Sequence, residues 1–145
     1  MEPVPARSLR VVLDTNVLIS MLHFRAGRLA DLRDALYERR FQMILSPAIV
    51  IELAKKLRTK FAWDESAIQQ TLRTLVRHAD IVPSTAIPGA VPNDPDDEAI
   101  IAAAVTGHAD VIVSGDRHLL TLKEHEGIPI VRPVDFLRMV AGAPK

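Results

Sequence analysis

Short apolar segments rich in β-branched residues alternate along this chain with longer segments of helical periodicity. Apolar residues recur three and four positions apart in the longer segments, as Leu29, Leu32 and Leu36 do. This alternation predicts an α/β fold with a mainly parallel central sheet of four to five strands and helices on both faces. The expected strands are Leu9–Leu13, Phe41–Leu45, Ile81–Val82, Val111–Val113 and Ile128–Val131.

Local signals place several helix ends. Ser46 followed by Pro47 is typical of a helix start, and this helix should run to about Arg58. Asp64 is expected to cap the next helix. Further helices are expected after Asp14, over Glu98–Thr106 with Gly107 as its C-cap, and over Pro133–Val140; Pro129 suggests that the last strand lies at a sheet edge.

Length and composition bound the architecture. A chain of 145 residues with 48% hydrophobic residues favours a single domain over residues 1–145, with a core from about 9 to 140. No cysteine is present, which excludes disulfides, cysteine-ligated metals and cysteine nucleophiles. No apolar run reaches the roughly 18–20 residues of a membrane span, and the first residues lack the layout of a signal peptide. We therefore expect a cytoplasmic protein without a membrane partner.

The charges cancel overall but are unevenly distributed. Residues 25–60 hold nine basic and four acidic residues, whereas residues 80–126 hold nine acidic and two basic ones. Most of these charges belong to solvated helix faces. The distribution also fits a basic rim beside an acidic pocket.

Three aspartates fall at positions where a parallel α/β sheet places its ligands. Asp14 and Asp116 each follow an apolar strand, and Asp97 stands at the start of the most apolar helix. If the first and fourth strands are neighbours, these carboxylates converge at one end of the sheet. Converging carboxylates repel one another, and a hard cation such as Mg²⁺ or Mn²⁺ relieves the repulsion.

Each acidic residue also has a simpler interpretation. Asp14 and Asp97 can each cap the helix that follows, and Asp116 can be a turn residue after Gly115. Glu52 lies in an apolar helical stretch, where it either faces a pocket or pairs with Lys56 four residues later. Four such independent roles at these positions would be a coincidence.

Four sequence blocks together resemble the PIN domain family, and more narrowly the toxin components of bacterial and archaeal toxin–antitoxin pairs related to the VapC toxins. The blocks are VVLDTNVLIS, LSPAIVIEL, NDPDDEAIIAAA and DVIVSGDRHLL, and the resemblance runs from about Arg10 to Phe136. It implies that one or two Mg²⁺ or Mn²⁺ ions are bound by Asp14, Glu52, Asp97 and Asp116. It further implies that Asn16 and Ser114 support the site or contact phosphate. Asp94 and Asp96 are candidates for supporting Asp97, and Glu98 stands beside them.

The resemblance implies metal-assisted hydrolysis of RNA, a possible cognate antitoxin and a homodimer. The basic residues between 25 and 60 would then hold the phosphate backbone with little base specificity. Two other classes remain. A phosphatase or phosphotransfer domain would use Asp14 as a phosphoacceptor, but it fits less well because Asn16 stands where a second aspartate is expected. A non-catalytic or housekeeping PIN-fold protein would bind or process RNA without an antitoxin.

Overall fold

The computed structural model describes residues 9–24, 27, 29–84 and 95–141. Its sheet contains six strands in the order β3-β2-β1-β4-β6-β5. All neighbouring strands are parallel except β5 and β6, which are antiparallel. The strands are β1 (Arg10–Leu13), β2 (Gln42–Leu45), β3 (Ala79–Ile81), β4 (Val111–Val113), β5 (Glu124–His125) and β6 (Ile128–Val131).

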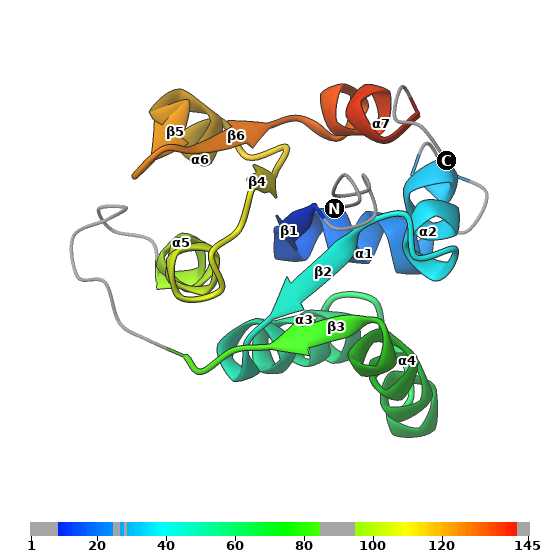
Figure 1. Cartoon of the computed structure of the whole chain (residues 1–145). Coiled ribbons are helices and arrows are strands. Elements are labelled where there is room, and N and C mark those ends of the chain that lie inside the picture. Colours follow the sequence, from blue (N-terminus) through cyan, green and yellow to red (C-terminus); the bar gives the residue numbers. More distant parts are fainter. Residues whose placement is uncertain (1–8, 25–26, 28, 85–94, 142–145) are drawn as a thin grey trace.

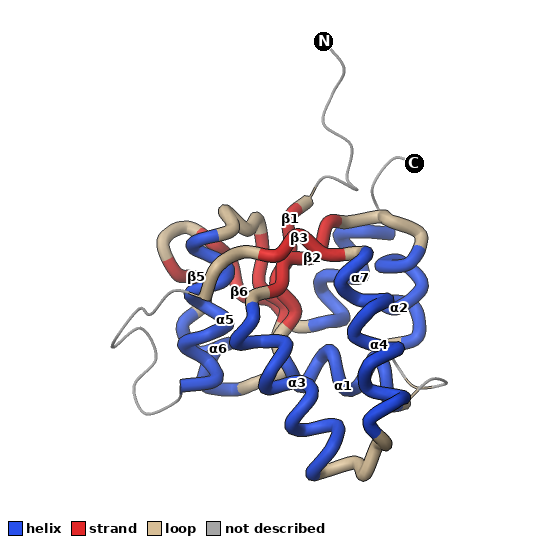
Figure 2. The backbone as a smooth tube through the Cα atoms, turned by 90° about the horizontal axis from the view of Figure 1, so that it is seen from below, coloured by secondary structure: helices blue, strands red, loops and turns tan. Residues whose placement is uncertain are grey.

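Seven helices connect and cover these strands. Figure 2 shows α5 and α6 on one side of the strands and α1, α2, α4 and α7 on the other. The predicted α/β class with helices on both faces is therefore confirmed. The helices are α1 (Thr15–His23), α2 (Ala30–Tyr37), α3 (Pro47–Thr59), α4 (Glu65–Arg77), α5 (Pro95–Thr106), α6 (Arg117–Leu122) and α7 (Pro133–Ala141). No helix in the described ranges is long and apolar enough to cross a bilayer.

The core lies where the central strands meet the covering helices. Val11, Val12 and Leu13 of β1 are completely buried, as is all of β4, because both strands have neighbours on each side and helices on both faces (Figure 1). Continuous apolar strands of this kind are typical of buried parallel sheets. The small residues Ala102, Ala103 and Ala104 let α5 pack closely on β1, β2 and β4.

Predicted helix caps are present in the structure. The Ser46 side chain accepts a hydrogen bond from Ile49 N (3.3 Å), with Pro47 as the first helical residue. The Asp64 carboxylate accepts from Ala67 N (2.7 Å) at the start of α4. These residues satisfy backbone donors that the first turn of a helix leaves without partners.

The C-terminal part of the sheet differs from the sequence prediction. The described sheet has six strands instead of four to five, because the two-residue strand β5 pairs with β6 and was not predicted. The short helix α6 stands between β4 and β5. Glu126 (φ 49°) and Gly127 (φ 81°) join β5 to β6 with the two left-handed residues that a type I′ hairpin requires. Pro129 is consequently not in an edge strand, since β5 pairs with β6 on its outer side.

Gly107 directly follows α5, at the predicted C-cap position, but the left-handed conformation usual for a glycine at a helix end belongs to the next residue. The left-handed residue after α5 is His108 (φ 52°), and Ala109 N donates to Ala104 O (2.9 Å) in the pattern of a Schellman motif. A Cβ atom on Gly107 would lie 2.9 Å from both Ala103 O and Ile44 Cγ2. Glycine at this position therefore permits close packing of the helix end on β2.

Candidate active site

Strand order reverses between β1 and β4, which is where ligands bind in open α/β sheets. Leu13 of β1 is paired in register with Val113 of β4, and Asp14 N donates to Val113 O (2.9 Å). The residues that follow the two strands therefore lie side by side. This confirms that the first and fourth predicted strands are neighbours.

Asp14 caps α1 and also reaches across to β4. Its Oδ1 atom accepts hydrogen bonds from Asn16 N (2.7 Å) and Val17 N (3.4 Å), so the capping interpretation is confirmed. Its Oδ2 atom accepts from the Ser114 hydroxyl (2.5 Å). An ionised carboxylate has about four lone-pair positions, so these bonds leave acceptor capacity for another ligand.

Ser114 joins Asp14 to Asp116. This serine is completely buried, and its Oγ atom accepts a hydrogen bond from Asp116 N (2.9 Å) while it donates to Asp14. The Asp116 carboxylate accepts from His118 N (2.7 Å) and caps α6. The Ser114 hydroxyl thus connects the Asp14 carboxylate to the backbone of Asp116 at the end of β1 and β4, and we call these three residues the Asp14–Ser114–Asp116 group.

Burial raises the pKa of Asp14 above its usual value of 3.8. The hydrogen bonds from Ser114, Asn16 N and Val17 N lower this pKa, whereas the negative charge of Asp116 raises it. Desolvation is the largest effect because only 4% of Asp14 is exposed. A cation at this position would favour the charged form that burial disfavours.

Glu52 and Asp96 lie in the wall of a pocket next to the Asp14–Ser114–Asp116 group. The pocket has a volume of 290 Å³ and is lined by Thr15, Ala48, Ile49, Ile51, Glu52, Asp96 and Ala99. Thr15 directly follows Asp14, so this pocket adjoins the Asp14–Ser114–Asp116 group. Glu52 also pairs with Lys56 (Nζ to Oε1 3.8 Å), which means that both sequence interpretations of Glu52 describe real contacts.

The remaining predicted site residues differ in how deeply they are buried. Asp97 lies in the first turn of α5 and is 6% exposed, whereas the neighbouring Asp96 is exposed. Asp94 lies outside the described residues. Asn16 is exposed in the first turn of α1. Across residues 9–24, 29–84 and 95–141, no three or more Asp, Glu or His side chains form one group that could hold an ion.

The donor set nevertheless fits a hard cation. All the candidate donors in the Asp14–Ser114–Asp116 group are oxygens, which suits Mg²⁺ or Mn²⁺. Mg²⁺ commonly keeps several waters and takes only one or two carboxylates together with substrate phosphates. Asp14 and Asp116 supply that number, and Asp14 gains from a nearby positive charge.

Several basic residues of the predicted phosphate-binding rim have other partners. Arg58 donates to both carboxylate oxygens of Glu65 (2.9 and 2.7 Å), and Arg40 donates to Val140 O (3.1 Å). Lys55 and Lys60 remain exposed on or beside α3. Arg25 and Arg28 lie outside the described residues.

Two residues of the pocket were not singled out by the sequence. Thr15 is buried and lines the pocket. Its position between Asp14 and Asn16 is the sequence feature that could have indicated it. Ile51 is 68% exposed beside Glu52, an unusual position for isoleucine. The exposure of Ile51 could not be predicted, because a run of apolar residues around Glu52 is typical of a buried helix face.

Fold and site together define a class: α/β proteins with a parallel sheet whose acidic residues meet at the carboxyl ends of two adjacent central strands. A family model described as PIN domain matches residues 10–118. The chain belongs to the PIN domain family.

The chain is similar to other proteins over most of its length. The chain is 32% identical over 130 residues to the uncharacterized protein MJ1680 of Methanocaldococcus jannaschii, which covers 86% of this chain and 81% of that protein. Among solved structures, PAE2754 from Pyrobaculum aerophilum is 14% identical with a TM-score of 0.63, covering 92% of this chain and 90% of that one.

Two further structures share the fold. VapBC2 from Rickettsia felis, solved bound to a DNA fragment from its promoter, is 12% identical with a TM-score of 0.58 and covers 86% of this chain and 98% of that one. The PIN domain endonuclease Utp24 is 19% identical with a TM-score of 0.55, covering 87% and 86%. At these identities the likeness concerns the fold.

Proposed function

We propose that this chain is an endoribonuclease that depends on Mg²⁺ or Mn²⁺, and that it is the toxin of a type II toxin–antitoxin pair. The observation that carries the proposal is the Asp14–Ser114–Asp116 group at the point where strand order reverses, in a chain of the PIN domain family. The sequence resemblance to VapC-like toxins supports the more specific role. A cytoplasmic homodimer is part of the same proposal.

Asp14 and Asp116 would hold the ion, with Glu52, Asp96 and Asp97 as further oxygen donors. When bound, a divalent ion supplies a Lewis acid that activates water and neutralises the charge that develops on the phosphate. Ser114 fixes the orientation of the Asp14 carboxylate through its hydrogen bond and ties it to the backbone of Asp116. Such outer contacts keep ligands in place and are needed for activity.

Other residues would bind the RNA. Asn16 is exposed in the first turn of α1, where an amide side chain can donate to a phosphate oxygen. Lys55 and Lys60 are exposed and can contact the phosphate backbone without reading bases. Their contribution should weaken as the salt concentration rises.

The test is cleavage of a mixed RNA pool by the purified chain, with and without EDTA. Asp14→Asn and Asp116→Asn keep the side-chain shape and should each lower the cleavage rate by more than about a hundredfold. Asp64→Asn is the matched control, because Asp64 also caps a helix but lies outside the site. Normal cleavage by the Asp14 and Asp116 variants, when they are folded, would refute the proposed site.

The toxin role has its own test. Co-expression with the product of the adjacent gene should suppress RNA cleavage and relieve growth arrest if that product is the antitoxin. If the chain cleaves RNA with metal but the product of the adjacent gene does not inhibit it, the ribonuclease proposal stands and the toxin role is refuted. Light scattering of the purified chain tests the homodimer.

A further inference from the structure

A cavity of 430 Å³ lies between α2 and α4, away from the acidic site. It is lined by Leu22, Arg33, Tyr37, Trp63, Gln70, Thr71 and Thr74. Leu22 is seven residues beyond Thr15 in α1, which corresponds to about 10 Å along the helix. A ligand in this cavity would therefore leave the Asp14–Ser114–Asp116 group accessible.

Arg33 is a half-buried basic residue of α2 that forms no ion pair with a described residue. Its Nη1 atom is buried, and no described residue accepts a hydrogen bond from it. A guanidinium stays protonated in proteins, so it cannot avoid this cost by losing its charge. Buried polar atoms normally have a hydrogen-bond partner, and a bound water, ion or ligand group can supply the one that the described residues do not.

The rest of the wall favours an anion. None of the residues that line the cavity is an aspartate or a glutamate. Gln70 and Thr71 of α4 and Tyr37 of α2 bring further side chains that can donate hydrogen bonds. Trp63 has already used its Nε1 donor on His23 Nδ1 (2.9 Å), so its ring serves as an apolar wall together with Leu22.

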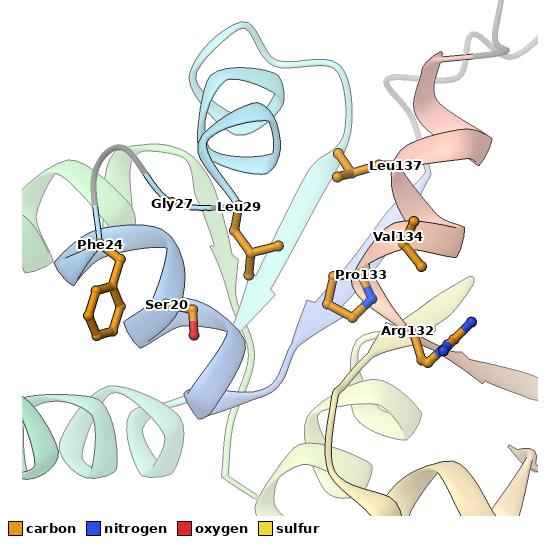
Figure 3. A pocket seen from close by; sticks show the side chains of 8 residues that line it. All are labelled: Ser20, Phe24, Gly27, Leu29, Arg132, Pro133, Val134 and Leu137. Carbon is orange, nitrogen blue, oxygen red and sulfur yellow. The ribbon is translucent and has the colours of Figure 1, made fainter.

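Another pocket of the molecule lacks this property. It has a volume of 740 Å³ and lies between α1, the start of α2 and α7, with a mainly apolar lining that includes Phe24, Leu29 and Val134 (Figure 3). Its arginine, Arg132, pairs with Asp135 of α7 (Nε to Oδ2 3.5 Å). Because Asp135 already pairs with this arginine, the pocket gives no indication of which ligand it would bind.

We propose that the cavity around Arg33 binds an aspartate or glutamate side chain presented by a partner protein. A carboxylate on a short apolar stem fits both features of the site, since the stem can pack on Trp63 and Leu22 while the carboxylate accepts from Arg33. Carboxylates and guanidinium groups form strong hydrogen bonds with matched geometry. A phosphodiester carries a ribose on each side, so it is bulkier than a carboxylate and fits less well beside a half-buried arginine.

This inference goes beyond the nuclease proposal and does not depend on it. RNA cleavage depends on the Asp14–Ser114–Asp116 group, whereas partner binding depends on Arg33. The two can therefore fail separately. An Asp14→Asn variant that no longer cleaves RNA should still bind the partner peptide with unchanged affinity.

The probe is a library of random peptides displayed on phage, selected in parallel on the full chain and on its Arg33→Gln variant. Arg73→Gln is the matched control, because Arg73 is an exposed arginine of α4 outside the cavity wall. Selected peptides should share one aspartate or glutamate flanked by apolar residues. Selected peptides without a shared acid, or recovery of the same peptides on Arg33→Gln, would overturn the proposal.

The affinity of one selected peptide is then measured by fluorescence of Trp63, the single tryptophan, which lies in the cavity wall. Arg33→Gln, and separately replacement of the peptide's acid by its amide, should each weaken binding about tenfold or more, whereas Arg73→Gln should not. The peptide variant keeps the test valid even if Arg33→Gln unfolds. Arg33→Gln that weakens RNA binding and spares peptide binding would instead identify a phosphate site and overturn the proposal.

Discussion

Replacing Ser114 with alanine is the sharpest test of how the acidic site is held together. The hydroxyl donates to the buried Asp14 carboxylate and accepts from Asp116 N, so Ser114→Ala removes two hydrogen bonds. A bond to a charged group contributes about 1.5–3 kcal/mol and a neutral one about 0.5–1.5 kcal/mol. We expect the free energy of unfolding at pH 7, in EDTA, to fall by about 2–4 kcal/mol.

The loss should also depend on pH. The Ser114 bond lowers the pKa of Asp14, so its removal raises that pKa further above 3.8. A carboxyl group with a raised folded-state pKa destabilises the protein progressively as the pH rises from the unfolded value through the folded one. The effect of Ser114→Ala should therefore be smaller near pH 4 than at pH 7.

Urea unfolding followed by circular dichroism at both pH values measures these differences. Ser46→Ala is the matched control, because Ser46 is equally buried but caps α3 with no acidic partner. It should cost about 1 kcal/mol at either pH. If Ser114→Ala costs no more than this control, or costs the same at both pH values, the hydroxyl does not support the Asp14 carboxylate.

Three further predictions follow from other features. Mn²⁺ at a hundred times its Kd should stabilise the chain by about 2.7 kcal/mol and raise its melting temperature by about 5–10 °C, and Asp14→Asn should abolish this response. Gly107→Ala should destabilise the chain by about 1–3 kcal/mol in urea unfolding because its Cβ would meet Ala103 O and Ile44 Cγ2, whereas His108→Gly should stabilise it by about 0.5–1 kcal/mol. Glu52→Gln should lower RNA cleavage, and full activity would show that pairing with Lys56 is its whole role.

The sequence predicts the central part of the fold well. Local signals decide it: the apolar strands that end in Asp14 and Ser114, and the Ser46-Pro47 start of α3, need no distant partner to be recognised. The hairpin at Glu126 and Gly127 was missed because a glutamate in the left-handed region is uncommon and gives no turn signal. The position of Gly107 after α5 was predicted, but its close approach to Ile44 was not, because that contact joins distant parts of the chain.

Side-chain burial is harder to predict from sequence than the elements themselves. Arg33 belongs to a run of basic residues that the sequence assigns to an RNA-binding rim, yet its Nη1 atom is buried in a cavity wall. Helical periodicity places Arg33 next to the buried Leu32 but does not say whether another helix covers it. The position of α4 decides this, and α4 follows more than thirty residues later in the chain.

Both outer strands of the described sheet are very short. β3 has three residues and β5 has two, and exposed acids occupy each of them, Asp80 and Glu124. Asp80 is moreover held by Arg10 Nη2 (2.7 Å). A long, uncharged edge strand would offer a template on which a second molecule could extend the sheet, and these strands do not. Addition of strands from a second copy at these two edges of the described sheet is therefore disfavoured, which removes one route by which copies of the chain could grow into fibres at high concentration.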